Sequence, residues 1–154
     1  MTNSNLKYAT NATGAWVATT FDNSAGAADS GQYSSIALDS SNKAYISYRY
    51  WDGVSTIALR YATNATGGWV ITTVNSGTSI GWDTSIAIDA SNKAHISYTD
   101  RSPYDLKYAT NATGGWVITT VDNAAMVTMG TSIGLDSTGR VHISYYDSNP
   151  NYDL

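Results

Sequence analysis

The chain has 154 residues and a net charge of -4, and all 12 of its acidic residues are aspartate. An acidic balance without any run of basic residues argues against nucleic acid and against an anionic membrane surface as partners. The lack of cysteine excludes disulfides and thiolate metal sites. Twelve tyrosines and five tryptophans, together with many Val, Ile and Thr residues and no glutamate, favour an all-β fold.

The sequence shows neither an apolar window of membrane-spanning length nor the basic start and apolar block of a signal peptide. The compartment stays open between the cytoplasm and a trimmed secreted protein.

The chain is a tandem repeat. The stretch LKYATNATGAWVATT and its close copies begin at Leu6, Leu59 and Leu106. The stretch SSIALDSSNKAYISY and its copies begin at Ser34, Thr84 and Thr131. Over sixteen positions the second and third copies of the first stretch differ only at Arg60 against Lys107, and the periods are 53 and 47 residues. Such self-similarity predicts a repeat architecture.

In chain order, residues 6–10 and 16–21 are predicted strands joined by a turn at 11–14. A polar, glycine-rich connection follows at 22–33. Apolar and polar residues then alternate at 35–39 and 44–50, which indicates a second hairpin closed at 40–43. The first hairpin type returns at 56–74. Each period therefore holds four short strands in an antiparallel meander.

The repeat frame divides one domain, residues 1–154, into two complete four-stranded units and two complementary halves. The halves are 6–22 and 131–147, the complete units are 33–74 and 83–121, and residues 148–154 are expected to begin another strand. Three units do not close a ring, since propellers need about four to eight blades. The pattern therefore predicts that the hairpin at 131–147 meets the hairpin at 6–22 of a second molecule, so that a homodimer forms six blades without a free edge.

The motif ALDSSNKAYISY, followed by LRYATN and GGWV, resembles the repeats of bacterial β-propellers of the sialidase-like, Asp-box group. The chain also resembles small propeller lectins whose short chains assemble into six blades. The resemblance implies a β-propeller and lectin-like binding. The chain departs from the Asp-box pattern because only Gly139 supplies its glycine and the aromatic position falls two residues late. The β-trefoil and the β-prism remain alternative folds, since both use three four-stranded repeats and close within one chain.

Comparison of the repeats locates the candidate ligand site. Two sets of connections vary between copies, and in a meander both lie on the same face, where binding residues concentrate. A Trp beside an Asp can stack on a sugar ring while the carboxylate accepts its hydroxyls; packing between sheets is the other interpretation of each Trp. The candidate ligand-binding residues are Tyr50, Trp51, Asp52, Trp82, Asp83, Asp100, Arg101, Tyr104 and Asp147.

Neither catalysis, nor a metal, nor a cofactor is expected. His95 and His142 occupy equivalent places in separate repeats, with no further ligand at metal-binding spacing. The four arginines occupy different repeat positions, unlike a carboxylate-binding triad, and glutamate is absent. Two hypotheses follow: a lectin-like module that binds glycans, or a structural scaffold of recently amplified or engineered repeats without a ligand. Fucose-binding propeller lectins use Arg, Glu and Trp in each site, so without glutamate that ligand is not transferred to this chain.

Overall fold

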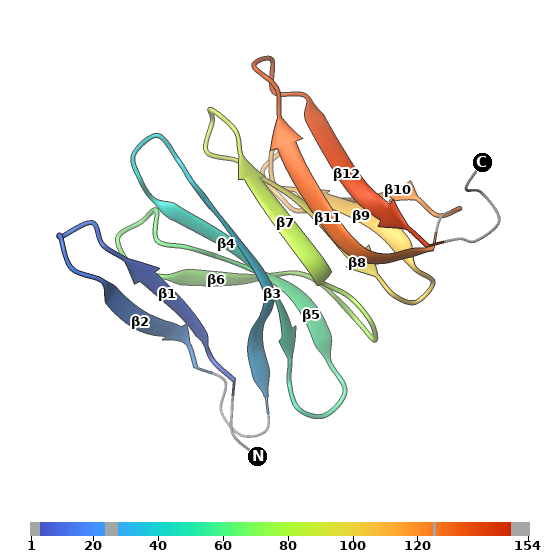
Figure 1. The fold of residues 1–154 in the computed structure, drawn as a ribbon, viewed down its shortest axis with the longest axis horizontal. Coiled ribbons are helices and arrows are strands. Elements are labelled where there is room, and N and C mark those ends of the chain that lie inside the picture. The colour runs from blue at the N-terminus through green and yellow to red at the C-terminus, as the bar shows by residue number, and fades with distance from the viewer. Residues whose placement is uncertain (1–3, 24–27, 125, 149–154) are drawn as a thin grey trace.

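The computed structural model of the chain describes residues 4–23, 28–124 and 126–148 (Figure 1). These residues form β strands and turns, with no helix among them. The strands are β1 (Leu6–Thr10), β2 (Val17–Asp22), β3 (Asp29–Leu38), β4 (Ala44–Trp51), β5 (Ile57–Thr63), β6 (Val70–Gly77), β7 (Trp82–Ile88), β8 (Ala94–Asp100), β9 (Asp105–Thr110), β10 (Val117–Asp122), β11 (Val127–Leu135) and β12 (Val141–Asp147). In the described part of the chain no helix is long and apolar enough to cross a membrane.

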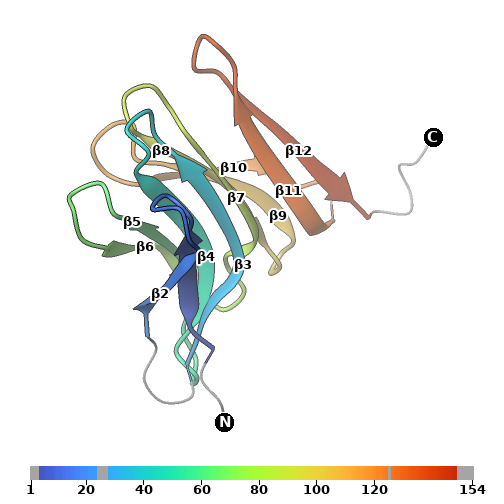
Figure 2. The same ribbon diagram turned by 60° about the vertical axis from the view of Figure 1, so that its left-hand side comes forward.

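Four antiparallel sheets follow one another along the chain. Sheet 1 is β1–β2, sheet 2 is β3–β4–β5–β6, sheet 3 is β7–β8–β9–β10, and sheet 4 is β11–β12. In Figures 1 and 2 they fan out with one broad face of each turned to the next. The prediction of four-stranded antiparallel meanders flanked by two hairpins is confirmed. The expected further strand at 148–154 lies, apart from Ser148, outside the described residues.

The second strand of each full sheet is its most buried strand. All of β8 except its last residue is buried, and the same holds for β4 up to Arg49. The two sheets share one register, since Ile46 pairs with Ala62 in sheet 2 and Ile96 with Ala109 in sheet 3. The near-identical sequences therefore fold into near-identical sheets.

The boundaries of the variable connections were predicted wrongly in two places. Residues 29–33, expected in a loop, belong to β3, and they pair with the end of β4 across irregularities in the register. Trp51 and Trp82, also expected in loops, are the last residue of β4 and the first of β7. These strand ends lack alternating apolar and polar residues, so the sequence pattern did not predict them. Their pairing with the neighbouring strand makes them part of the sheet.

The first strands of sheets 2, 3 and 4 pack beside one another, so that β3, β7 and β11 lie in a row (Figure 1). Short hydroxyl side chains join them. Thr84 donates its hydroxyl hydrogen to the carbonyl oxygen of Tyr33 at 2.8 Å, and its oxygen therefore accepts from the hydroxyl of Ser47 at 2.8 Å. Thr131 repeats the arrangement with the carbonyl oxygen of Asp83 and the hydroxyl of Ser97, at 2.9 and 2.8 Å.

Aromatic pairs join the outer parts of the sheets. Tyr8 of β1 contacts Trp69 of sheet 2 edge-to-face, with ring centroids 5.2 Å apart. Tyr61 of β5 contacts Trp116 of sheet 3 in the same geometry, also at 5.2 Å. We call the contact regions between successive sheets the first, second and third joints. Trp69 and Trp116, which occupy equivalent repeat positions, thus serve packing between sheets at the first two joints.

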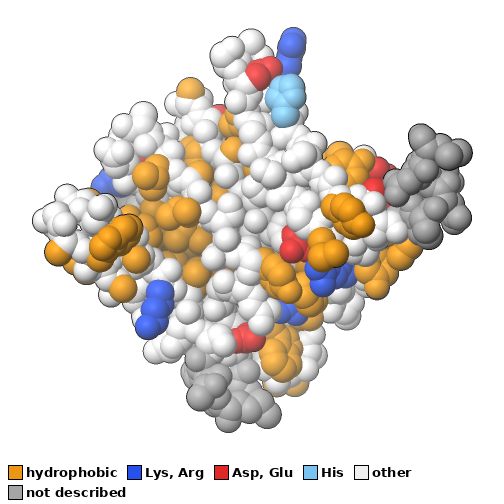
Figure 3. Space-filling view, viewed as in Figure 1, with side chains coloured by type: hydrophobic (Ala, Val, Ile, Leu, Met, Phe, Trp, Pro, Cys, Tyr) orange, Lys and Arg blue, Asp and Glu red, His pale blue; other side chains and the backbone are white. Residues whose placement is uncertain are grey.

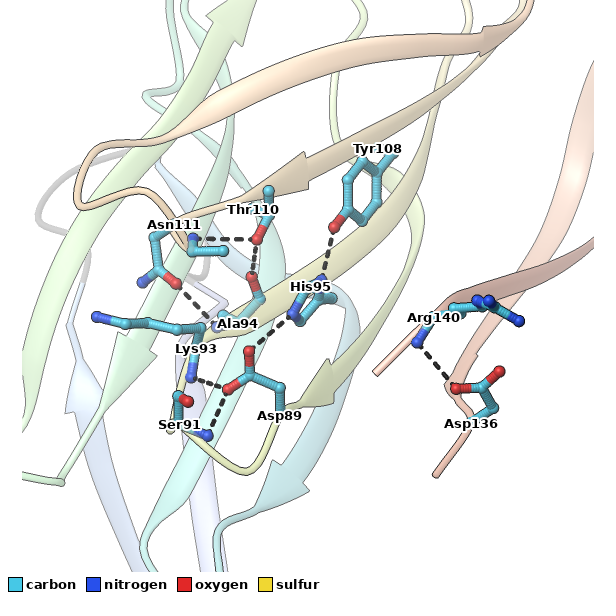
Figure 4. A network of polar contacts seen from close by, with 11 residues as sticks. Asp89, Ser91, Lys93, Ala94, His95, Tyr108, Thr110, Asn111, Asp136 and Arg140 are labelled. Atoms are coloured by element: carbon cyan, nitrogen blue, oxygen red, sulfur yellow. Dashed lines mark hydrogen bonds and ion pairs between the residues drawn. The ribbon is translucent and has the colours of Figure 1, made fainter. Parts of the chain in front are cut away.

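Each first hairpin turn is held by its aspartate. In sheet 3 the Asp89 carboxylate accepts hydrogen bonds from the backbone N–H groups of Ser91 and Lys93, both at 2.8 Å, and contacts His95 at 3.4 Å (Figure 4). His95 also contacts the Tyr108 hydroxyl at 2.6 Å. Asp89 and His95 therefore hold this turn and the neighbouring strand together. Within the described residues no group of three or more potential ligands is placed to hold a metal ion.

Candidate functional site

The second joint contains a cluster of aromatic and charged side chains at the edge of sheets 2 and 3. We call it the Trp82 cluster, and it consists of Tyr33, Arg49, Trp82, Asp83 and Arg101. The guanidinium carbons of Arg49 and Arg101 lie 4.4 and 4.0 Å from the centre of the indole ring. The Tyr33 ring lies 5.1 Å from it. The cluster thus combines three predicted residues with two from the neighbouring sheet.

The backbone at the start of β7, where the partly buried Trp82 lies, is irregular. The register between β7 and β8 shifts between Trp82 and Ser85, and Asp83 has a φ of 49°. Gly81 precedes them with a φ of 79°, and a Cβ there would lie 3.2 Å from the backbone of Ala58 and Leu59. Only glycine permits this close approach in the left-handed region. The bulge re-aims Trp82 and Asp83, as bulges beside functional sites do.

The charges of the cluster are balanced once the neighbouring Asp29 is included. Arg101 donates to the Asp83 carboxylate at 2.9 Å. Arg49 donates to the side-chain oxygen of Gln32, whose amide group donates to the Asp29 carboxylate at 2.7 Å. Burial lowers the pKa of Arg49 from its usual range. With Asp29 counted beside the cluster, two arginines stand against two aspartates, so the site and its surroundings are nearly neutral in sum and rich in hydrogen-bonding groups.

Three hydrogen-bond donors in the cluster lack an acceptor. They are the Nε1 of Trp82 and the Nε atoms of Arg49 and Arg101, all buried. Stacking on the indole supplies no acceptor for these donors, because a stacked guanidinium holds its N–H bonds parallel to the ring. The partly exposed groups at the cluster's edge are Tyr33, which is 40% exposed, and the side chains of Arg101 and Asp83.

The structure places the other predicted ligand residues elsewhere. Tyr50 lies at the first joint, where the guanidinium carbon of Arg60 sits 3.3 Å from its ring centre. Asp52 caps its own turn by accepting from the N–H groups of Val54, Ser55 and Thr56.

The remaining candidates also lie apart from the cluster. Asp100 accepts from the N–H of Ser102 in the turn after β8. Asp147 accepts from the N–H of Met126, and the carbonyl oxygen of Tyr104 accepts from the N–H of Val127, both beside sheet 4. Trp51, which ends β4, is partly buried. Of the nine predicted residues, the structure thus brings together Trp82, Asp83 and Arg101 in one cluster.

Sequence reasoning missed Tyr33 and Arg49. The repeat pattern predicts a connection at Tyr33, and comparison of the four arginines gives Arg49 no binding role. A usable signal was present: Arg49 stands where the later repeats carry Thr99 and Tyr146, so it interrupts an otherwise repeated strand. An isolated departure of that kind within a repeat marks a position that one joint uses differently from the others.

Comparisons with known proteins give the fold but no family. No family model and no curated protein matches the sequence. Among solved structures, the chain is similar to a fucose lectin from Kordia zhangzhouensis, determined in complex with methyl-fucoside, with a TM-score of 0.55 and 17% sequence identity. The match covers 76% of this chain and 85% of that chain. The protein is therefore an all-β chain of antiparallel sheets with a lectin as a structural neighbour.

Proposed function

We propose that the protein is a non-enzymatic, lectin-like module that binds glycans at the Trp82 cluster. The observation that carries this proposal is the placement of a Trp, two Arg and an Asp in one joint between sheets. Sugar recognition combines an apolar ring face with a few fixed polar groups. The exposed ring of Tyr33 offers such a face, and Arg101 and Asp83 offer a donor and an acceptor beside it.

The fucose lectin found by the structural comparison supports a carbohydrate ligand as the first class to test. Its sequence identity to this chain is only 17%, so the similarity suggests the class of fold and not the sugar. The cluster has both donors and acceptors of hydrogen bonds, and a neutral polyhydroxylated ligand can use both. A strongly charged ligand is disfavoured, because its charge would lose water without gaining an opposite charge in the site.

We further propose that the four sheets are blades of a β-propeller. The chain supplies two full blades and two halves, and two chains supply the six blades of a ring, within the usual range for propellers. In such a ring the Trp82 cluster would occur twice, and two sites on one particle give avidity toward a surface that displays many glycans.

The first test is a titration with methyl-fucoside and a panel of other neutral monosaccharides, with intrinsic tryptophan fluorescence as the readout. The second test is a glycan array. We expect saturable changes that the Trp82→Ala substitution abolishes. Arg101→Lys keeps the charge but removes the planar fork, and it should weaken binding while leaving the fold intact.

The matched control is Val54→Ala, a change at an 85% exposed residue in a turn away from the cluster. This variant should bind as the parent does. A blank array together with an unchanged fluorescence spectrum for the folded parent protein would refute the lectin function and favour a scaffold without a ligand.

A further inference from the structure

The third joint lacks the tryptophan that fills the first two. The repeated contact joins a Tyr of one sheet to a Trp just before the last strand of the next sheet. The Tyr lies on β1 in Tyr8–Trp69 and on the equivalent strand β5 in Tyr61–Trp116. The two remaining members of this series are Tyr108 and Trp16. Tyr108 lies in sheet 3 and Trp16 beside sheet 1, so the two do not meet within one chain. Trp16 is 73% exposed.

An apolar groove marks the place where the third tryptophan belongs. It lies between sheets 3 and 4, has a volume of about 300 Å³, and is lined by Leu106, Tyr108, Val121, Val141, Ile143 and Tyr145. At the second joint the equivalent positions are all buried. Val74 and Tyr98, for example, are 7% and 0% exposed, whereas their counterparts Val121 and Tyr145 are 50% and 40% exposed.

Among the described residues, sheets 1 and 4 have two strands each, whereas sheets 2 and 3 have four. Within the described residues, the outer edges of β1 and β12 carry no partner strand. In sheets 2 and 3 the equivalent strands pair with each other: Ile46 with Ala62, and Ile96 with Ala109. The same register applied to β12 and β1 pairs Ile143 with Ala9.

The face of β3 shows the same incompleteness. Ile36 and Leu38 are 52% and 55% exposed, whereas Ile86, the counterpart of Ile36, is 6% exposed because β3 covers it. A groove of about 200 Å³ separates β1 from β3, lined by Leu6, Lys7, Tyr8, Ala9, Ser34, Ser35, Ile36 and Ile46. Apolar side chains gather over this side of the molecule, on the left of Figure 3. The groove lies where a first and second strand would complete sheet 1.

We propose that these surfaces bind each other between two copies of this chain. The β11–β12 hairpin of one copy enters the groove between β1 and β3 of its partner, and Trp16 of the partner subunit fills the groove at the third joint. A second copy is the occupant because each of the two surfaces carries what the other lacks, position by position. The contact continues the row of joints already formed within the chain.

The internal repeats specify the new contacts. Asn64 and Asn111 accept hydrogen bonds from the N–H groups of Ala44 and Ala94, both at 2.8 Å; Asn11 of the partner subunit takes this role for Val141. The His95–Tyr108 contact at 2.6 Å predicts that His142 contacts Tyr8 of the partner subunit. The arrangement is reciprocal: the β11–β12 hairpin of the second copy meets β1 of the first copy in the same way. The two copies therefore form a closed dimer.

Engineered disulfides test the proposal, since the chain has no cysteine of its own. The double variant Ala9→Cys with Ile143→Cys joins positions that lie in sheets 1 and 4 of one chain, at opposite sides of Figure 1, but face each other across the proposed contact. Under mild oxidation we expect a covalent dimer on a non-reducing gel and a dimer by light scattering before oxidation.

Two controls share the design. Ala9→Cys with Ser144→Cys shifts the register by one residue and points the thiols to opposite faces, so it should not cross-link. Ala109→Cys with Ile96→Cys reproduces the tested pair inside sheet 3, where it should form a disulfide within one chain and run as a monomer on the gel.

The results decide the proposal clearly. The proposal is supported if Ala9→Cys with Ile143→Cys gives a covalent dimer and Ala9→Cys with Ser144→Cys does not. A parent protein that scatters as a monomer at micromolar concentration overturns it, and so does a ladder of trimers and longer species, which would mean open association without closure. Neither result depends on any glycan, so the proposed glycan binding can fail or succeed separately, whereas the proposed ring of two chains stands or falls with this contact.

Discussion

The Tyr48 hydroxyl donates a hydrogen bond of 2.7 Å to the carboxylate of Asp22, which links β4 to the last residue of β2. The carboxylate is buried and also accepts from Ser30 at 2.6 Å and Arg60 at 3.1 Å. Burial and this carboxylate raise the pKa of Tyr48, so the hydroxyl stays a donor at any ordinary pH. The second joint repeats the contact with a neutral partner, since Asn75 donates to the Tyr98 hydroxyl at 2.8 Å.

The first prediction compares these two hydroxyls. Tyr48→Phe removes a donor from a buried charge and should lower the free energy of unfolding by about 1.5–3 kcal/mol. Tyr98→Phe removes a bond between neutral groups and should cost about 1 kcal/mol. Urea unfolding of the two variants under the same conditions measures the difference. Equal losses would mean that the Asp22 carboxylate is not the reason for the strength of the first contact.

The second prediction concerns the turn residue Asn92, which has a φ of 60°. Asn92→Ala places a Cβ-bearing residue without a compensating polar group in the left-handed region, and it should destabilise by about 1–2 kcal/mol. Asn92→Gly should be within about 0.5 kcal/mol of the parent, because the third repeat carries Gly139 at this position with a φ of 82°. Thermal unfolding distinguishes the two variants, and equal midpoints would show that the turn relaxes.

The third prediction uses Trp16 as a reporter of the contact between copies. If its ring fills the groove at the third joint, the unfolding midpoint of the parent should depend on protein concentration, and Trp16→Ala should cost as much as a buried aromatic, about 3–5 kcal/mol. A tryptophan that stays exposed would cost less than about 0.5 kcal/mol. The comparison variant is Trp116→Ala, whose ring already contacts Tyr61 within the chain.

The fourth prediction is a loss of stability in acid. Hydrogen bonds from the backbone N–H groups of Val54 and Thr56 lower the pKa of Asp52 to about 2, whereas the unfolded value is about 3.9. A depressed pKa adds stability that is present above about pH 4 and is lost as the pH falls through about 2. The unfolding midpoint of the parent should therefore fall over this window more than that of Asp52→Asn. Parallel curves for the two proteins would contradict this role of the carboxylate.

Much of the fold could be predicted because repetition reveals what one segment alone hides. The alternation around Ile46 and Ile96, and the turn aspartates that follow the first strands, occur in each copy and so define strands and hairpins together. Trp82 and Asp83 could be selected as candidates because they stand outside the repeated pattern. Their position at a strand start could not be predicted, since the bulge after Gly81 depends on the close approach of Ala58 and Leu59 from another sheet.

The partners of the site were harder to predict than its members. Arg49 reaches Trp82 from the neighbouring sheet, and no sequence spacing shows that two strands in different repeats share an edge. Tyr50 and Asp52 were expected near Trp82 because the two sets of variable connections share one face. The ring of Tyr50 instead contacts Arg60 of β5, and the turn after β4 uses the Asp52 carboxylate.

The row of serine and threonine hydroxyls between β3, β7 and β11 gives every joint near the centre the same chemical form. Nothing in that row distinguishes one neighbour from another, so the contacts that identify a particular neighbour are those outside the row, such as the Trp82 cluster at the second joint. The row itself is therefore compatible with the gain or loss of a whole repeat, since each remaining hydroxyl keeps an acceptor.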